Sequence, residues 1–172
     1  MVPPNVKSSE QIGRGLYGPL IVDKKSPPKV DFDITWVLDG WRMSENGQID
    51  PSFHQMHDMF HGAQMGNITT LNGKKRETFN VWGEERIRLR LINVANACNF
   101  ALDFEGHFPQ VIALDGQPIK PFAPNSGEIK LWLGQRADLI IDMVGSPGTD
   151  FDFADTYYSS STYKFLTLVY ED

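Results

Sequence analysis

The stretch that decides the fold is Arg86–Asn93, which reads RIRLRLIN. Ile87, Leu89 and Leu91 take every second position, and arginines stand between them. A period of two places the apolar side chains on one face of a β-strand and the arginines on the other. The stretch therefore predicts a half-buried strand whose polar face is solvated or paired with carboxylates.

Short β-rich runs continue on both sides of this strand. They cover residues 32–39, 67–71, 100–104, 109–114, 128–133, 137–144 and 163–170. We expect residues 100–104 to pair with 109–114 in a hairpin, and residues 128–133 to pair with 137–144. Asn72-Gly73 and Asp115-Gly116 have the composition of tight turns. About eight or nine short strands, with turns every 8–12 residues, predict a β-sandwich or barrel.

Two segments depart from this pattern. Asp50 is a good N-cap before Pro51, and apolar residues then recur at helical spacing up to Gly62, so we expect a short helix over residues 51–61. Residues 150–162 (DFDFADTYYSSST) are polar and aromatic with few aliphatic side chains. We expect them to form a surface loop or an irregular edge strand.

Composition narrows the class of protein. The chain has 172 residues, of which 16 are Lys or Arg and 22 are Asp or Glu, for a net charge of −6. It contains no basic block and no apolar run near the roughly 20 residues of a membrane span, so we expect no nucleic-acid or membrane partner. A single cysteine excludes an internal disulfide and a Cys-based zinc site. The first residues do not have the pattern of a signal peptide.

A set of motifs resembles one family in its order and spacing. Residues 10–22 (EQIGRGLYGPLIV) resemble the join between the first and second domains of a multicopper oxidase. The further motifs are TLNG at 70–73, RLRLIN at 88–93, GHF at 106–108, IALDG at 112–116 and GQRAD at 134–138. The resemblance implies that residues 1–172 are a single, middle cupredoxin-like domain, an all-β Greek-key sandwich with one short helix. Residues 1–22 would be an interdomain-type lead-in segment.

The resemblance also implies copper ligands that this sequence lacks. Family members have a His-x-His pair where residues 4–7 read PNVK, and the first histidine here is His54. Four histidines in total cannot supply the set of imidazoles that the resemblance implies for a three-copper cluster. We therefore expect copper in the parent protein and none of the oxidase coppers in this chain. Either an excised middle domain or a natural copper-free protein fits this pattern.

Chemistry leads to the same expectation without the family. A blue-copper site needs two His, a Cys thiolate and usually a weak axial Met. Cys98 is followed by no histidine until His107 and no methionine until Met143. We therefore interpret Cys98 as a small buried thiol and His107 as a structural residue. We expect no catalytic residue, because nucleophile-elbow, P-loop and zincin motifs are absent from the sequence.

His54, His57 and His61 form the one cluster with metal-binding potential. On a helix they would line one stripe, near several methionines, and imidazole with thioether suits copper. An accessory surface copper site is one interpretation. A solvated or domain-facing helix side is the other, and we favour it.

Other side chains have structural interpretations. We expect Arg136 to form an ion pair with Asp138 or Asp115 that pins a strand junction. We expect the four tryptophans to pack in the core or between domains; they are Trp36, Trp41, Trp82 and Trp132.

The sequence thus predicts an architectural domain. The parent would couple one-electron oxidation of a phenolic or Cu(I) substrate to reduction of dioxygen to water, in the periplasm or outside the cell. Flanking cupredoxin domains of the same chain would be its partners, with self-association through faces such as Leu16-Tyr17 and Tyr157-Tyr158. The alternative is a stand-alone β-sandwich binding or adhesion module. A small electron-carrier cupredoxin is disfavoured by the ligand count.

Overall fold

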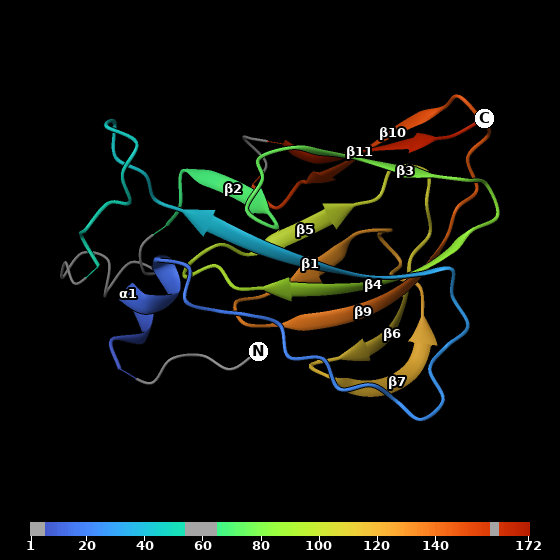
Figure 1. Ribbon diagram of the computed structural model, residues 1–172, viewed down its shortest axis with the longest axis horizontal. Helices are drawn as coiled ribbons and strands as arrows, with labels where there is room; N and C mark the ends of the chain where they lie inside the picture. Colours follow the sequence, from blue (N-terminus) through green and yellow to red (C-terminus); the bar gives the residue numbers. More distant parts are fainter. Residues whose placement is uncertain (1–5, 54–64, 159–161) are drawn as a thin grey trace.

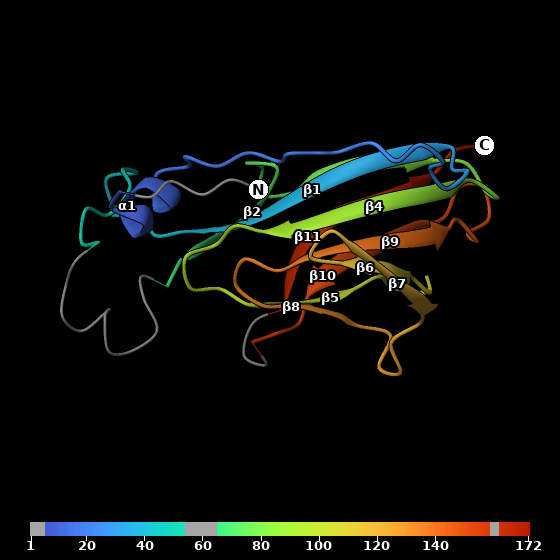
Figure 2. The ribbon, with the colours of Figure 1, turned by 90° about the horizontal axis from the view of Figure 1, so that it is seen from below.

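The computed structural model of this chain describes residues 6–53, 65–158 and 162–172, which form two stacked β-sheets (Figures 1 and 2). In spatial order the first sheet holds β2 (Ile68–Leu71), β1 (Phe32–Trp41), β4 (Arg86–Asn93), β9 (Arg136–Asp142), β6 (Gln110–Leu114) and β7 (Gln117–Phe122). The second holds β3 (Glu77–Val81), β11 (Tyr163–Tyr170), β10 (Asp150–Asp155), β5 (Phe100–Asp103) and β8 (Ile129–Leu131). The predicted all-β sandwich is confirmed.

The strand predicted from RIRLRLIN lies in the middle of the first sheet. β4 pairs in parallel with β1 and antiparallel with β9. Ile87, Leu89 and Leu91 are buried in the core between the sheets. Aromatic rings pack edge to face in this core. The ring centroids of Trp36 and Phe165 are 5.9 Å apart. The period of two therefore predicted the buried face correctly.

The four tryptophans have different environments. Trp36 belongs to the core, and Trp41 is half-buried and donates from its indole to Thr70 Oγ1 at 2.9 Å. Trp82 and Trp132 are each 53% exposed. Core packing is confirmed for Trp36, and interdomain packing of Trp82 and Trp132 stays a prediction.

Both predicted tight turns are present. Asn72 and Gly73 have φ of 49° and 79°, and Asp115 and Gly116 have φ of 48° and 81°. Positive φ at both central residues is what the Asn-Gly and Asp-Gly pairs tolerate best. The second turn joins β6 to β7 in a true hairpin.

Both predicted hairpins further along the chain are wrong. β5 and β6 belong to different sheets, so residues 104–109 cross the sandwich instead of closing a hairpin. β8 and β9 are likewise in different sheets. A glycine-containing loop between two strands indicates that the chain turns back. The same kind of loop also occurs where the chain crosses from one sheet to the other. The sequence pattern does not separate these two cases.

The prediction for residues 150–162 also needs correction. Residues 150–155 form β10, which lies between β11 and β5 in the second sheet and not at its edge. Phe153, Ala154 and Asp155 are buried, because the aromatic side chains of this segment face the core. The expected irregularity is present as a register shift between Phe153 and Ala154.

The described residues contain one helix, and its place differs from the expected one. Residues 51–53 are not helical, and residues 54–64 lie outside the described part of the chain. The helix found is α1 (Ser8–Gly13), which the sequence did not predict, and β3 and β7 were also missed. α1 is held to the sandwich by Asn96, whose side-chain amide donates to the carbonyl of Ser9 at 2.8 Å.

The chain after α1 runs along the outside of the first sheet without regular structure (Figure 2). At one end the hydroxyl of Tyr17 donates to the Asp39 carboxylate of β1 at 2.6 Å. At the other end the backbone N–H of Asp31 donates to the Arg86 carbonyl at 2.8 Å. The segment is therefore fastened to the sheet at both ends. No helix among the described residues is long and apolar enough to cross a membrane.

Candidate functional site: a charged groove under the lead-in chain

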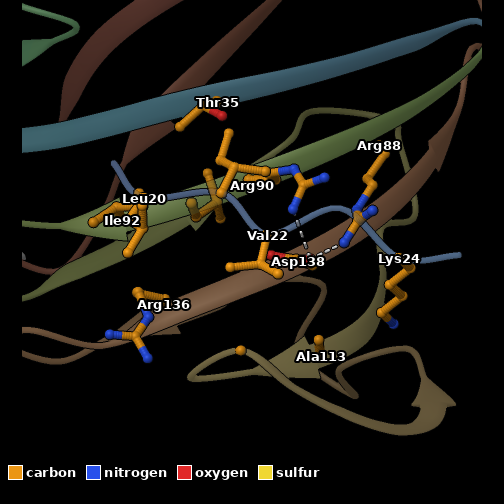
Figure 3. A pocket seen from close by; sticks show the side chains of 13 residues that line it. Leu20, Val22, Lys24, Thr35, Arg88, Arg90, Ile92, Ala113, Arg136 and Asp138 are labelled. Atoms are coloured by element: carbon orange, nitrogen blue, oxygen red, sulfur yellow. Dashed lines mark hydrogen bonds and ion pairs between the residues drawn. The ribbon is translucent and has the colours of Figure 1, made fainter. Parts of the chain in front are cut away.

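A groove of about 320 Å³ lies between residues 20–24 and the outer face of the first sheet (Figure 3). Its floor comes from β1, β4, β6 and β9, which contribute Thr35, Arg88, Arg90, Ala113 and Asp138. Leu20, Val22 and Lys24 lie over this floor from the unstructured chain. The groove exists because arginines alternate with apolar residues along β4, so the outer face of the sheet is charged.

Ion pairs fill the floor of the groove. Arg90 forms a bidentate pair with Asp33, with N–O distances of 2.6 and 2.7 Å. Arg88 donates to Asp138 and lies 3.5 Å from Asp33, and Arg90 lies 3.8 Å from Asp138. The two arginines of β4 therefore share each carboxylate and link β4 to β1 and β9. Figure 3 shows both guanidinium groups turned toward Asp138. The charge-paired face predicted for this strand is confirmed.

Burial differs sharply among Arg86, Arg88 and Arg90, the three arginines of β4, which form a ladder along its outer face. The Arg88 side chain is only 4% exposed, that of Arg90 is 14% exposed, and that of Arg86 is 53% exposed. The hydrogen bond from Arg90 holds the pKa of Asp33 below its usual value. Asp33 held in this way favours its ionised, paired form, so the floor can hold strands and orient the chain above it. It is poorly suited to acid–base chemistry.

Arg136 makes contacts other than the expected ion pair. Its guanidinium donates to the backbone carbonyl of Asp115 at 2.7 Å, and its backbone N–H donates to Asp115 Oδ1 at 2.9 Å. Asp138 pairs with Arg88 and Arg90 instead, since the neighbouring strand β4 presents both guanidinium groups to it. Arg136 does pin a strand junction, but by hydrogen bonds to the β6–β7 turn.

Cys98 is a buried thiol, as predicted. It is 6% exposed and packs so closely on β1 that a Cβ placed on Gly40 would lie 2.6 Å from its sulfur. Burial raises the pKa of the Cys98 thiol, and the carboxylates of Asp39 and Asp155 raise it further. A neutral thiol in this setting is a packing group and a poor nucleophile.

His107 is structural, as predicted. It is 4% exposed, and its Nδ1 lies 2.8 Å from the carbonyl oxygen of Glu105. A carbonyl only accepts, so Nδ1 carries the proton, and Nε2 accepts from the Tyr170 hydroxyl at 2.6 Å. Both ring nitrogens are therefore engaged, and neither offers a free lone pair to a metal.

The part of the chain that the structure describes offers no copper donor set. No group of three or more His, Cys, Asp or Glu side chains among those residues is arranged to hold a metal ion. Cys98 and His107 are both committed to the core, so they do not fit such a site. His54, His57 and His61 fall in residues 54–64, outside the described residues, and their copper site stays a prediction.

Sequence reasoning missed two buried carboxylates. Burial raises the pKa of Asp39 to about 6 although Tyr17 and the backbone N–H of Gly40 donate to it. Burial also raises the pKa of Asp155, and the nearby carboxylate of Glu128 raises it further. The available signal was an acidic residue directly after two apolar ones, with Val37-Leu38 before Asp39 and Phe153-Ala154 before Asp155.

The family model described as Multicopper oxidase matches residues 35–170. Laccase-3 of Thanatephorus cucumeris is 30% identical over 191 aligned residues, which cover 95% of this chain and 31% of that protein. Laccase-1 of Botryotinia fuckeliana is 30% identical over 76% of this chain and 24% of its own length. The chain thus spans less than a third of the curated relatives that it matches here.

Solved structures of the same class share the fold. A multi-copper oxidase from Pseudomonas thermotolerans superposes with a TM-score of 0.84 at 28% identity, over 95% of this chain and 38% of that one. Lac15 from a marine microbial metagenome has a TM-score of 0.70 at 33% identity, over 92% of this chain and 37% of that one. The sandwich is therefore cupredoxin-like, and the chain belongs to the multicopper oxidase family.

Proposed function

We propose that this chain is the middle, non-copper-ligating domain of a multicopper oxidase, and that its role there is architectural. The whole enzyme would oxidise a phenolic or Cu(I) substrate one electron at a time and reduce dioxygen to water. It would work in the periplasm or outside the cell. The stand-alone adhesion module has no specific observation in its favour.

One observation carries this proposal: a cupredoxin-like sandwich whose cysteine and described histidine are both used for packing. A blue-copper site needs a thiolate and two imidazoles that face one point. Here Cys98 is a neutral buried thiol beside Gly40, and His107 is held through both ring nitrogens. The domain thus has the cupredoxin-like fold, while Cys98 and His107 pack its core and do not face a common point. This is what we expect of a spacer domain.

Exposed apolar side chains are the proposed contacts with flanking domains. Leu16 is 59% exposed, and Trp132 and Leu133 are 53% and 49% exposed. Trp132 lies edge-on to Tyr157 at 6.1 Å, so one patch joins the β8–β9 loop to the chain after β10. Large exposed apolar patches mark interaction sites. We expect the isolated chain to self-associate through them, and sedimentation velocity of wild type against Trp132→Ser and Leu16→Ser checks this.

Absorption spectroscopy after copper loading tests the proposal. The 172-residue chain, incubated with Cu(II) and freed of excess metal, is expected to show no intense thiolate-to-copper charge-transfer band. Cys98→Ala is the matched control, because it removes the one thiol and leaves the histidines in place. An intense band in wild type that disappears in Cys98→Ala would contradict the proposal.

A separate proposal concerns the histidine cluster, which would deliver or sense copper. If His54, His57 and His61 bind copper, we expect a weak site that loses affinity as pH falls through about 6.5, because neutral imidazole is the ligand. Calorimetric titration of wild type against His57→Ala decides it, since His57 belongs to both pairs at helical spacing. Equal copper affinities would end this proposal and leave the architectural one intact.

A further inference from the structure

A second cavity, of about 380 Å³, opens where the edge of the first sheet meets the second sheet. It is lined by Ile68 of β2, by Cys98 just before β5 and Phe100 at its start, and by Asp155, Tyr158 and Tyr163 around the β10–β11 connection. Aromatic and apolar side chains line one part of it, and Asn67, Thr69 and Lys75 line another. Its volume suits a molecule with one ring.

Asp155 is the unusual member of this lining. It is only 6% exposed, and its Oδ1 accepts from the backbone N–H groups of Ala101 at 2.9 Å and Tyr157 at 3.1 Å. Its other oxygen, Oδ2, forms no hydrogen bond with any part of the chain that the structure describes. The carboxylate is therefore fixed in position by one oxygen while the other stays available.

No cation of the described residues forms an ion pair with this carboxylate. The salt bridges within residues 6–53, 65–158 and 162–172 pair other acidic groups, and Lys75, which also lines the cavity, makes none with Asp155. Cys98 and the tyrosines are neutral, and the carboxylate of Glu128 raises the pKa of Asp155 further. Buried charges are normally paired, because an uncompensated one is costly.

From this geometry we propose that the cavity binds a small organic ammonium ion carrying one aromatic or apolar ring. The ammonium group lies against Asp155 Oδ2, where it supplies the missing positive charge. The ring lies among Phe100, Tyr158 and Tyr163, whose faces favour both apolar contact and a nearby cation. This site is separate from the charged groove and involves no copper, so it stands or falls independently of the proposed function.

Calorimetry with two probes of equal size tests the site. Phenethylamine carries the ammonium group, and 2-phenylethanol replaces it with a neutral hydroxyl. Wild type is expected to bind phenethylamine at least about tenfold more tightly, since a hydrogen bond between two charged groups is the stronger kind. Equal affinities, or no binding of phenethylamine, would overturn the proposal.

A matched pair of variants locates the effect. Asp155→Asn keeps an oxygen for the two backbone N–H groups but removes the charge, and it is expected to abolish the preference for phenethylamine. Asp150→Asn makes the same change at an exposed position of the same strand and is expected to retain the preference. A preference that survives Asp155→Asn would overturn the proposal.

Amide chemical shifts of wild type keep the test valid if Asp155→Asn fails to fold. The N–H resonances of Ala101 and Tyr157, which donate to Asp155, are expected to move with phenethylamine and much less with 2-phenylethanol. Phenethylamine-induced shifts confined to other parts of the chain would place the amine elsewhere and refute the site.

Discussion

The acidic side chains of this domain fall into two groups with opposite environments. On the outer face of the first sheet, Asp33, Asp138 and Asp142 are each held by arginines of β4. Asp39 of β1 and Asp155 of β10 are instead buried and rely on neutral donors. Pairing lowers the pKa of Asp33 and Asp142, whereas burial raises the pKa of Asp39 and Asp155.

The contrast separates two functions within one sandwich. Paired carboxylates crosslink strands and favour the folded state when ionised. Unpaired buried carboxylates oppose folding when ionised, so a protein keeps them where they do something else. Asp39 accepts a hydrogen bond from the hydroxyl of Tyr17 and so fastens the lead-in chain to β1, while Asp155 faces a cavity.

Removing the central guanidinium of the paired group should have the largest effect. Arg88→Ala leaves Asp138, which is 17% exposed, without its main partner and opens a hole beneath residues 20–24. Breaking a buried pair by deleting one member costs about 4 kcal/mol. Urea unfolding should show this loss, and a change below about 1 kcal/mol would mean that the ladder is not a stabilising feature.

The unpaired group should respond to pH in the opposite sense. The pKa of Asp39 rises from 3.8 to about 6 on folding, so its favourable contribution is present below pH 3.8 and is lost as pH rises through about 6. Relative to wild type, Asp39→Asn should gain up to about 3 kcal/mol of unfolding free energy between pH 4 and pH 7.

Urea unfolding of both proteins across this range measures that difference. Asp33→Asn is the matched comparison, because the pKa of Asp33 is lowered and ionisation stabilises the fold. Its deficit relative to wild type should be full and constant between pH 4 and pH 7, and it should shrink only as pH falls below about 3.8. Parallel pH profiles for wild type and Asp39→Asn would show that Asp39 titrates normally.

The smallest effect is expected at the exposed end of the ladder. Arg86 and Asp142 form a two-bond pair of 2.5 and 2.8 Å, but their side chains are 53% and 51% exposed. Exposed pairs contribute little because water and salt screen them. Arg86→Ala should therefore cost a small fraction of the Arg88→Ala loss in urea unfolding. Equal losses would show that burial does not rank these pairs.

The sequence predicted what local patterns determine. RIRLRLIN identified the central strand and its charged face, and Asn72-Gly73 and Asp115-Gly116 identified turns, because each depends on neighbours within a few residues. The interpretations of Cys98 and His107 also held, since isolated ligands rarely form a metal site.

What the sequence missed depends on contacts between distant segments. The crossings between β5 and β6 and between β8 and β9 are decided by how two layers stack, which no local turn signal encodes. The segment of β10 was expected to be a surface loop or an irregular edge strand, because its inward-facing residues are aromatic and not aliphatic. Asp39 and Asp155 became notable only once burial placed them beside Tyr17 and a cavity.

Dioxygen consumption by the copper-loaded 172-residue chain, with a phenolic electron donor, tests the central claim of an architectural domain most directly. We expect a rate no greater than that of the same amount of copper salt alone, and the same rate for Cys98→Ala. A rate well above free copper that is lost in Cys98→Ala would contradict it, because the chain would then hold a working copper centre of its own.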